Sequence, residues 1–99
     1  MIKLPCNIGD KIFVVEDYNE FYDKCHYYET KYGNKIVLKE YMVDVFIVDE
    51  NGVHIGEYTH DGAVRFDQNH DLTLNVKWGD CKIFFNELEA KEFIKGVRR

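Results

Sequence analysis

Apolar and polar residues alternate along several short segments of the chain, and a spacing of two predicts β-strands. Pairs that favour tight turns, such as Asn51-Gly52 and Asp61-Gly62, separate these segments. The segment over 42–48 is apolar on both faces, so we expect it to lie at the centre of a sheet. The predicted strands run over 11–16, 35–48, 53–58, 63–67, 72–78 and 81–85.

The end of the chain changes to the spacing of an α-helix. Asn86 is a favoured N-cap, Glu89 follows three residues later, and Gly96 is placed to end the helix. Apolar residues form one helical stripe at Ala90, Phe93, Ile94 and Val97. The sequence therefore predicts a single α+β domain over 1–99, mainly β. We expect a small SH3-like antiparallel barrel, or a strongly bent sheet, with a C-terminal helix on one side.

The segment over 17–34 fits more than one structure. Helical spacing relates four of its side chains, Phe21, Cys25, Tyr28 and Tyr32, and predicts a short helix over 17–32. Five tyrosines lie between residues 18 and 32, however, and they suit strands or an irregular insert equally well.

Length and composition limit the choices further. A chain of 99 residues can bury one modest core. No stretch approaches the roughly 20 apolar residues of a membrane-spanning helix. The apolar part of the N-terminus is also too short for a signal peptide, so we predict a cytoplasmic protein.

Charge is distributed unevenly along the chain. Residues 16–71 contain 13 acidic and 5 basic side chains, whereas the rest of the chain contains 5 acidic and 8 basic ones. The acidic middle repels nucleic acid and favours a basic protein surface as partner.

No pattern in the sequence predicts catalysis, a metal or a cofactor. Cys6, Cys25 and Cys81 are widely spaced, which argues against a disulfide framework, and together with the 4 histidines they form no zinc-binding pattern. The chain contains no serine and no glycine-rich phosphate loop. We therefore predict a protein that is not an enzyme, and keep a cysteine- or metal-dependent enzyme as an alternative.

The acidic, tyrosine-rich segment is the candidate binding site. Tyrosines bury a large area at low entropic cost in protein interfaces, and charges steer the encounter. The alternative is that these tyrosines pack on the barrel. The predicted partner-binding residues are Glu16, Asp17, Tyr18, Glu20, Tyr22, Asp23, Tyr27 and Tyr28.

Two ends of the chain resemble a group of small phage and prophage proteins of Firmicutes. "LPCNIGDKIFVV" looks like their LPCxxGDxV opening, and "WGDCKIFFNELEAKEFIK" is similar to their closing GKxVFxTxEEAE strand and helix. The matching positions are Leu4, Pro5, Cys6, Gly9, Asp10, Ile12, Gly79, Ile83, Phe84, Phe85, Glu89, Ala90 and Ile94. Leu88 departs from the pattern, since an acid is usual there.

The resemblance implies a mobile-element origin and a barrel with a helix, but no activity. With the acidic segment, it favours a protein-binding module that inhibits a host defence nuclease, as anti-CRISPR proteins do, in the host cytoplasm. The alternative is an SH3-like barrel that binds nucleic acid or regulates a complex through its basic end at Lys91, Lys95, Arg98 and Arg99.

Overall fold

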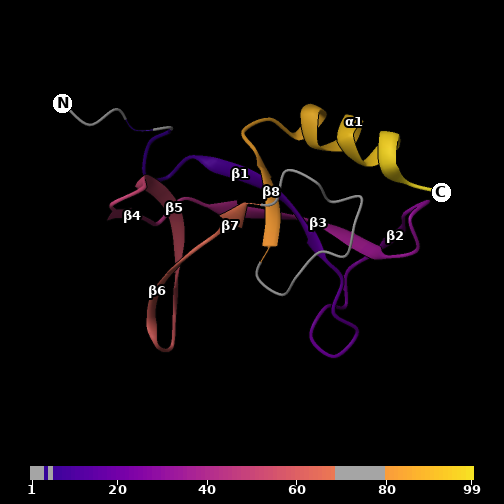
Figure 1. Ribbon diagram of the computed structural model, residues 1–99, viewed down its shortest axis with the longest axis horizontal. Helices are drawn as coiled ribbons and strands as arrows, with labels where there is room; N and C mark the ends of the chain where they lie inside the picture. Colours follow the sequence, from indigo (N-terminus) through magenta and orange to yellow (C-terminus); the bar gives the residue numbers. More distant parts are fainter. Residues whose placement is uncertain (1–3, 5, 69–79) are drawn as a thin grey trace.

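The structure, a computed structural model, describes residue 4 and residues 6–68 and 80–99. Within these residues the chain forms strands and one C-terminal helix (Figure 1). The elements are β1 (Lys11–Asp17), β2 (Tyr28–Glu29), β3 (Lys35–Met42), β4 (Val45–Asp49), β5 (Gly52–Thr59), β6 (Gly62–Arg65), β7 (Asp67–Gln68), β8 (Asp80–Phe84) and α1 (Glu87–Val97). The strand predicted over 72–78 lies outside the described residues.

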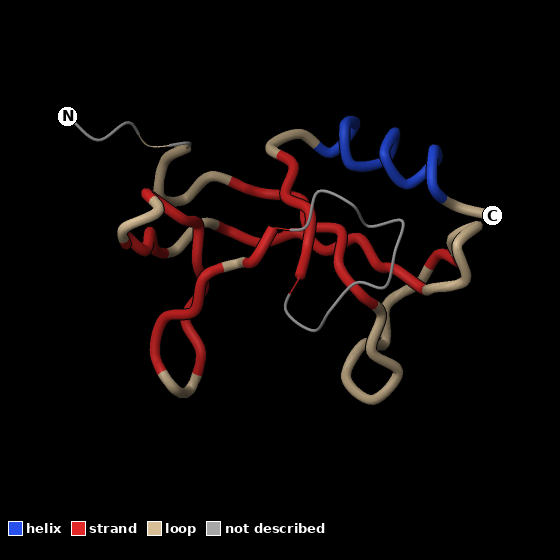
Figure 2. Tube along the Cα trace, in the orientation of Figure 1, coloured by secondary structure: helices blue, strands red, loops and turns tan. Residues whose placement is uncertain are grey.

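The strands form two sheets, which confirms the expected α+β, mainly β class. The larger sheet has the order β2-β3-β1-β8-β7, in which β7 pairs parallel to β8 and the other pairs are antiparallel. The smaller sheet is the antiparallel meander β4-β5-β6. The described strands do not close into the expected SH3-like barrel; they form two separate sheets instead (Figure 2).

Strand β1, rather than the segment over 42–48, is the central strand of the larger sheet. The prediction for 42–48 was wrong because the chain leaves one sheet and enters the other at Val43. The Val43 N–H donates to the carbonyl of Asp10 at 2.8 Å, and its carbonyl accepts from the Gly9 N–H at 2.8 Å. These bonds tie Val43 to the turn before β1, and the next strand, β4, becomes an edge of the smaller sheet.

The two faces of β1 enter two separate apolar clusters. Val15 packs with Ile36 of β3 and with the buried side of α1. Ile12 and Val14 point to the opposite face, where they pack with residues of the smaller sheet such as Ile55. Alternation along one strand therefore joins the helix on one side to the smaller sheet on the other.

Helix α1 begins as its sequence predicts and ends one residue later. The Asn86 side chain accepts hydrogen bonds from the Leu88 and Glu89 N–H groups, which is the expected N-cap. The helix continues through Gly96 to Val97, and the Arg98 N–H closes it on the carbonyl of Ile94 at 2.8 Å. Its buried stripe consists of Ala90, Ile94 and Val97, with Phe93 half-buried beside them.

The helix predicted over 17–32 is not formed. Asn19 instead organises a tight turn, in which its side-chain oxygen accepts from the Phe21 N–H and its carbonyl accepts from the Asp23 N–H. The chain then runs to the short strand β2 and turns back through Gly33, which has a positive φ of 95°. Local hydrogen bonding by Asn19 therefore prevails over the helical spacing of the apolar side chains.

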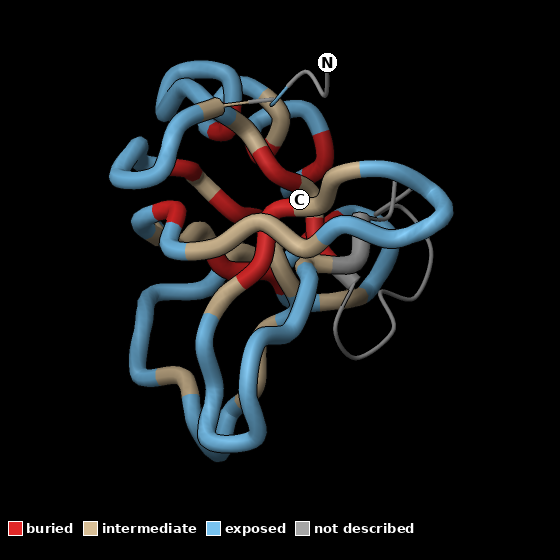
Figure 3. Tube along the Cα trace, turned by 90° about the vertical axis from the view of Figure 1, so that its left-hand side faces the viewer, coloured by how far each residue is buried: buried red, intermediate tan, exposed pale blue. Residues whose placement is uncertain are grey.

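Two segments project from the same side of the body: the loop over residues 18–27, called here the loop arm, and the β5–β6 hairpin, called the hairpin arm (Figure 1). Figure 3 shows that the buried residues gather in the middle of the molecule, and the residues of β6 in the hairpin are exposed. No helix of the described chain has the length and apolar character needed to cross a membrane.

Candidate functional site

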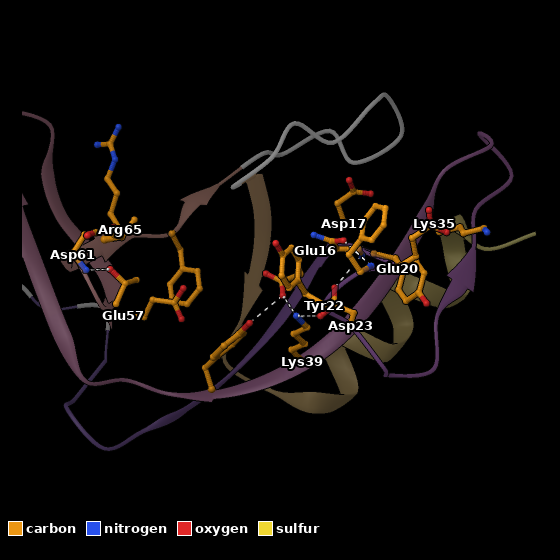
Figure 4. Close-up of a pocket in the computed structure, with 17 residues that line it drawn as sticks. Glu16, Asp17, Glu20, Tyr22, Asp23, Lys35, Lys39, Glu57, Asp61 and Arg65 are labelled. Atoms are coloured by element: carbon orange, nitrogen blue, oxygen red, sulfur yellow. Dashed lines mark hydrogen bonds and ion pairs between the residues drawn. The ribbon is translucent and has the colours of Figure 1, made fainter.

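The space between the two arms is an open groove of about 990 Å³ (Figure 4). Its floor comes from β1 and β3, and its walls come from the loop arm and the hairpin arm. The lining residues are Glu16, Asp17, Tyr18, Asn19, Glu20, Phe21, Tyr22, Asp23, Lys35, Lys39, Tyr41, Glu57, Thr59, Asp61, Val64, Arg65 and Phe66.

The floor continues the face of β1 that carries Ile12 and Val14, but there the side chains are ionic. Lys39 Nζ lies 2.9 Å from Glu16 Oε1 and also contacts the carboxylate of Asp23. The Tyr41 hydroxyl donates to the same Glu16 oxygen at 3.0 Å. These three contacts join β1, β3 and the loop arm, so they hold the base of the loop in place.

The pKa shifts of this cluster follow from its partial burial. Burial by itself would raise the pKa of Asp23, but the hydrogen bond from Lys39, with one from the Asn19 N–H, holds it below its ordinary value. Burial would lower the pKa of Lys39, yet its bonds to Asp23 and Glu16 raise it. Burial and the adjacent Glu16 charge raise the pKa of Tyr41, which therefore remains a neutral hydrogen-bond donor.

The loop arm displays two aromatic side chains from a fixed turn. Asp23 accepts from the Asn19 N–H at 2.9 Å, and its own N–H donates to the Asn19 carbonyl at 2.7 Å. Phe21 and Tyr22 are each 84% exposed at the tip of this turn. Ordered aromatic side chains with this exposure are typical anchors in protein interfaces.

The base of the hairpin arm is held by a second ionic contact, in which Arg65 of the groove lining pairs with Asp49. Asp49 at the end of β4 lies 2.9 Å from His54 Nε2 and accepts from Arg65 Nη1 at 3.0 Å. The contact with His54 is the main reason that the pKa of Asp49 is lowered, and the Asn51 N–H and Arg65 add to it. This contact ties β4 to β5 and β6, while Glu57 and Asp61 of the same arm line the groove.

The groove has an excess of negative charge. It is lined by six carboxylates and three cationic side chains. Lys39 is shared by Glu16 and Asp23, Arg65 pairs with Asp49, and Lys35 lies over the ring of Tyr27 at 4.8 Å. Within the described chain, four of the groove carboxylates have no ion pair: Asp17, Glu20, Glu57 and Asp61.

The pKa of two of these carboxylates is raised, although only Glu57 is half-buried and Asp17 is exposed at the end of β1. Burial raises the pKa of Asp17, against a smaller opposing effect of the Tyr18 N–H. Burial, followed by the charge of Glu16, raises the pKa of Glu57. A cation that enters the groove would reverse both effects, because a nearby positive charge favours the ionised carboxylate.

The groove brings together most of the partner-binding residues predicted from the sequence. Six of the eight line it: Glu16, Asp17, Tyr18, Glu20, Tyr22 and Asp23. Tyr27 lies beside them, with its ring centroid 4.7 Å from that of Tyr18. Tyr28 does not join them, because it packs half-buried against the cluster under α1.

Sequence reasoning missed the opposite wall and much of the floor. Lys39 and Tyr41 come from β3, Glu57 and Asp61 come from the hairpin arm, and Phe66 follows β6 directly. The only sequence signal for the hairpin residues was their acidity, which does not show that they face residues 16–23.

The cysteines and the basic end of the chain lie apart from the groove. Cys25 is exposed, Cys81 is buried, and Cys6 is half-buried against the cluster that contains Cys81. In the described ranges no three His, Cys, Asp or Glu side chains are grouped to hold a metal ion. At the basic end, Lys91 pairs with Glu87 at 2.9 Å and Arg99 lies 3.9 Å from Glu29.

No family model matches the sequence, and comparisons with curated proteins and with solved structures find no similar protein.

Proposed function

We propose that the chain is a protein-binding module, not an enzyme, that uses the groove and the loop arm to bind a basic surface of another protein. The observation that carries this proposal is the set of four groove carboxylates without an ion pair in the described chain. Cations of a partner would supply the missing charge, and complementary charge speeds and orients association.

The loop arm supports the same proposal from a different property. Binding energy in protein interfaces is concentrated in a few aromatic or arginine side chains. Phe21 and Tyr22 are highly exposed on a turn that hydrogen bonds and the Lys39 contact already fix. A fixed turn loses little conformational entropy on binding, so such a pair is suited to enter a pocket of the partner.

In its more specific form, the proposal is an inhibitor of a host defence nuclease, similar in action to anti-CRISPR proteins and of phage or prophage origin. Nucleases carry positively charged channels for nucleic acid, and an acidic groove with aromatic walls is complementary to them. The resemblance of both chain ends to small phage proteins supports this origin. The host cytoplasm is the proposed compartment.

The proposal is tested by capture of proteins from a Firmicutes lysate on the immobilised chain. The groove variant combines Asp17→Asn, Glu20→Gln and Tyr22→Ala. The control combines Glu50→Gln, Glu92→Gln and Tyr32→Ala, which removes the same charge and one exposed tyrosine away from the groove. We expect a basic protein that binds the native chain and the control but not the groove variant.

The captured protein is then purified, and its binding is measured at increasing salt. Affinity should fall with salt, because the contact depends on charge. For the nuclease form of the proposal, the chain should also displace nucleic acid from the captured protein. Equal capture by the groove variant and the control would contradict the proposed site.

A further inference from the structure

We infer that the groove receives an arginine side chain from an extended basic segment of the partner, at a subsite formed by Glu57, Tyr41 and Phe66. This inference rests on the proposed function and specifies the chemistry of its partner. It is argued from the position of one carboxylate, from two adjacent rings and from the acids on both arms.

Glu57 is the carboxylate of the groove that most needs a cation. It lies on β5 and is half-buried, and its side chain reaches into the space between the arms (Figure 4). The Glu57 carboxylate forms no hydrogen bond or ion pair within the described chain, whereas the carboxylate of the nearby Glu16 has both Lys39 and Tyr41 as partners. A shielded carboxylate without a partner is costly, and a bound cation would relieve that cost.

Two aromatic rings lie next to this carboxylate. Tyr41 and Phe66 both line the groove, with ring centroids 5.3 Å apart and planes inclined by 56°. Both rings are half-buried against the cluster shared by the two sheets, so their positions are fixed. A cation placed beside Glu57 would therefore lie against aromatic faces as well as a carboxylate.

This combination favours arginine over lysine. A guanidinium is planar, pairs with a carboxylate through two parallel hydrogen bonds, and stacks on aromatic rings with little loss of hydration. An ammonium group is compact and strongly hydrated, so it gains less in a half-buried, ring-lined site.

The rest of the groove points to an extended segment rather than a single side chain. Asp61 lies on the hairpin arm, Asp17 ends β1 and Glu20 lies on the loop arm, so acids without an ion pair in the described chain stand on both sides of the Glu57 subsite. A peptide laid between the arms could pair a basic side chain with each of them. A folded basic surface could reach the loop tip, but an extended segment fits the space between the arms better.

The charges around Glu57 also predict a pH dependence. Glu57 faces Glu16 of β1, Lys39 and Tyr41 of β3, and Asp44 of the connection to β4, all of which contribute to the local field. Because burial and Glu16 raise its pKa, Glu57 begins to take up a proton above the ordinary value of 4.5. Binding of arginine should therefore weaken at a higher pH than for an ordinary glutamate.

The test measures fluorescence anisotropy with two short labelled peptides, one of alternating arginine and glycine and one of alternating lysine and glycine. The native chain should prefer the arginine peptide several-fold. Glu57→Gln should weaken arginine binding about tenfold, since a charge-assisted bidentate pair is lost. Glu92→Gln, which removes the same charge from the exposed side of α1, is the matched control.

A second variant, Phe66→Leu, removes one ring and keeps apolar bulk. It should reduce the preference for arginine over lysine, while thermal unfolding shows that the chain is still folded. These results together would support the subsite.

Equal binding of the two peptides, or equal effects of Glu57→Gln and Glu92→Gln, would overturn the subsite and leave the broader proposal to the capture experiment. The subsite would also be overturned, and the broader proposal kept, if the groove variant lost capture of the lysate protein while Glu57→Gln still captured it. Binding of a labelled single-stranded RNA with no binding of the basic peptides would overturn both proposals.

Discussion

The two faces of the five-stranded sheet differ in what covers them, although the same strands supply both. On the helix-covered face, Val15 and Ile36 pack against the apolar stripe of α1, and these side chains bury one another in a single cluster. On the groove face, the row that starts with Ile12 and Val14 continues into Glu16, and the arms leave an acidic space beyond it.

Under the proposed function, stability and binding depend on separate surfaces of this small domain. The buried apolar side chains that stabilise the fold lie under α1 and between the two sheets. Four carboxylates of the groove form no ion pair within the part of the chain that the structure describes, and they leave negative charge available to another molecule. Mutations can test this separation, because changes to one face should leave the property of the other unaltered.

The largest expected effect comes from the helix-covered face. Ile94 is only 3% exposed, so Ile94→Ala should lower the free energy of unfolding by about 2–5 kcal/mol, measured by urea denaturation. Leu88→Ala on the same helix is the control, because Leu88 is 66% exposed and should change stability little. If the folded Ile94 variant binds the arginine peptide more weakly than the native chain, the two faces are coupled and the comparison fails.

The next effect concerns the hairpin arm. A Cβ at Gly56 would lie 2.8 Å from Ile47 Cδ1 and 2.9 Å from the Val64 carbonyl oxygen, so Gly56→Ala forces the arm to shift. We expect a loss of about 1–3 kcal/mol in thermal or urea unfolding.

Gly96→Ala is the matched control for this change. Gly96 lies within α1 with no atom near its Cβ position, so alanine should stabilise the helix by up to about 1 kcal/mol. If the Gly56→Ala protein has native stability, the hairpin arm can shift to accommodate the added Cβ without a loss of free energy of unfolding. The arm would then not be a fixed wall of the groove.

The helix-covered face was the easier part to predict from the sequence. The cap at Asn86 and the stripe of Ala90, Ile94 and Val97 are local signals, and each has the role that its spacing indicates. The strands over 11–16 and 53–58 were also clear, because alternation and the Asn51-Gly52 turn are local properties.

The groove was harder to predict because it depends on contacts between distant segments. Residues 16–23 were identified from their acidity and tyrosines, but the wall opposite them follows from how the smaller sheet is placed. The segment over 17–32 was misread as a helix because the hydrogen bonds of Asn19 and Asp23 compete with helical spacing. The break at Val43 had no local signal, since the run of apolar residues continues through it.

An effect of a size similar to that of Gly56→Ala is expected at the floor of the groove. Lys39→Met removes the cation shared by Glu16 and Asp23, whose side chains are 21% and 10% exposed. Hydrogen bonds to charged groups of this kind contribute about 1.5–3 kcal/mol, so the variant should unfold more easily and its loop amides should exchange faster. Lys11→Met is the control, since its contact with Glu40 spans 3.8 Å at the exposed surface.

The loss of stability caused by Lys39→Met should depend on pH in a predictable direction. The pKa of Asp23 is lowered in the folded chain, so its stabilisation is present above the ordinary value of 3.8 and is lost as the pH falls through the lowered pKa. The difference in stability between the native chain and Lys39→Met should therefore shrink below pH 3.8. A constant difference across this range would show that Lys39 acts through packing of its stem instead of through Asp23.

The smallest expected effect returns to the helix-covered face, at the N-cap of α1. The Asn86 side-chain oxygen accepts from the Leu88 N–H at 2.8 Å and from the Glu89 N–H at 3.3 Å, so Asn86→Ala leaves both donors without this partner. We expect a loss of about 1 kcal/mol, while Asn86→Asp, which keeps an acceptor and adds a negative charge at the helix start, should retain native stability. Affinity for the arginine peptide should be equal in all three proteins. The cap is therefore a sensitive test of separation, because the change is too small to unfold the chain. Any accompanying loss of peptide binding would show that the position of the helix influences the groove through β1.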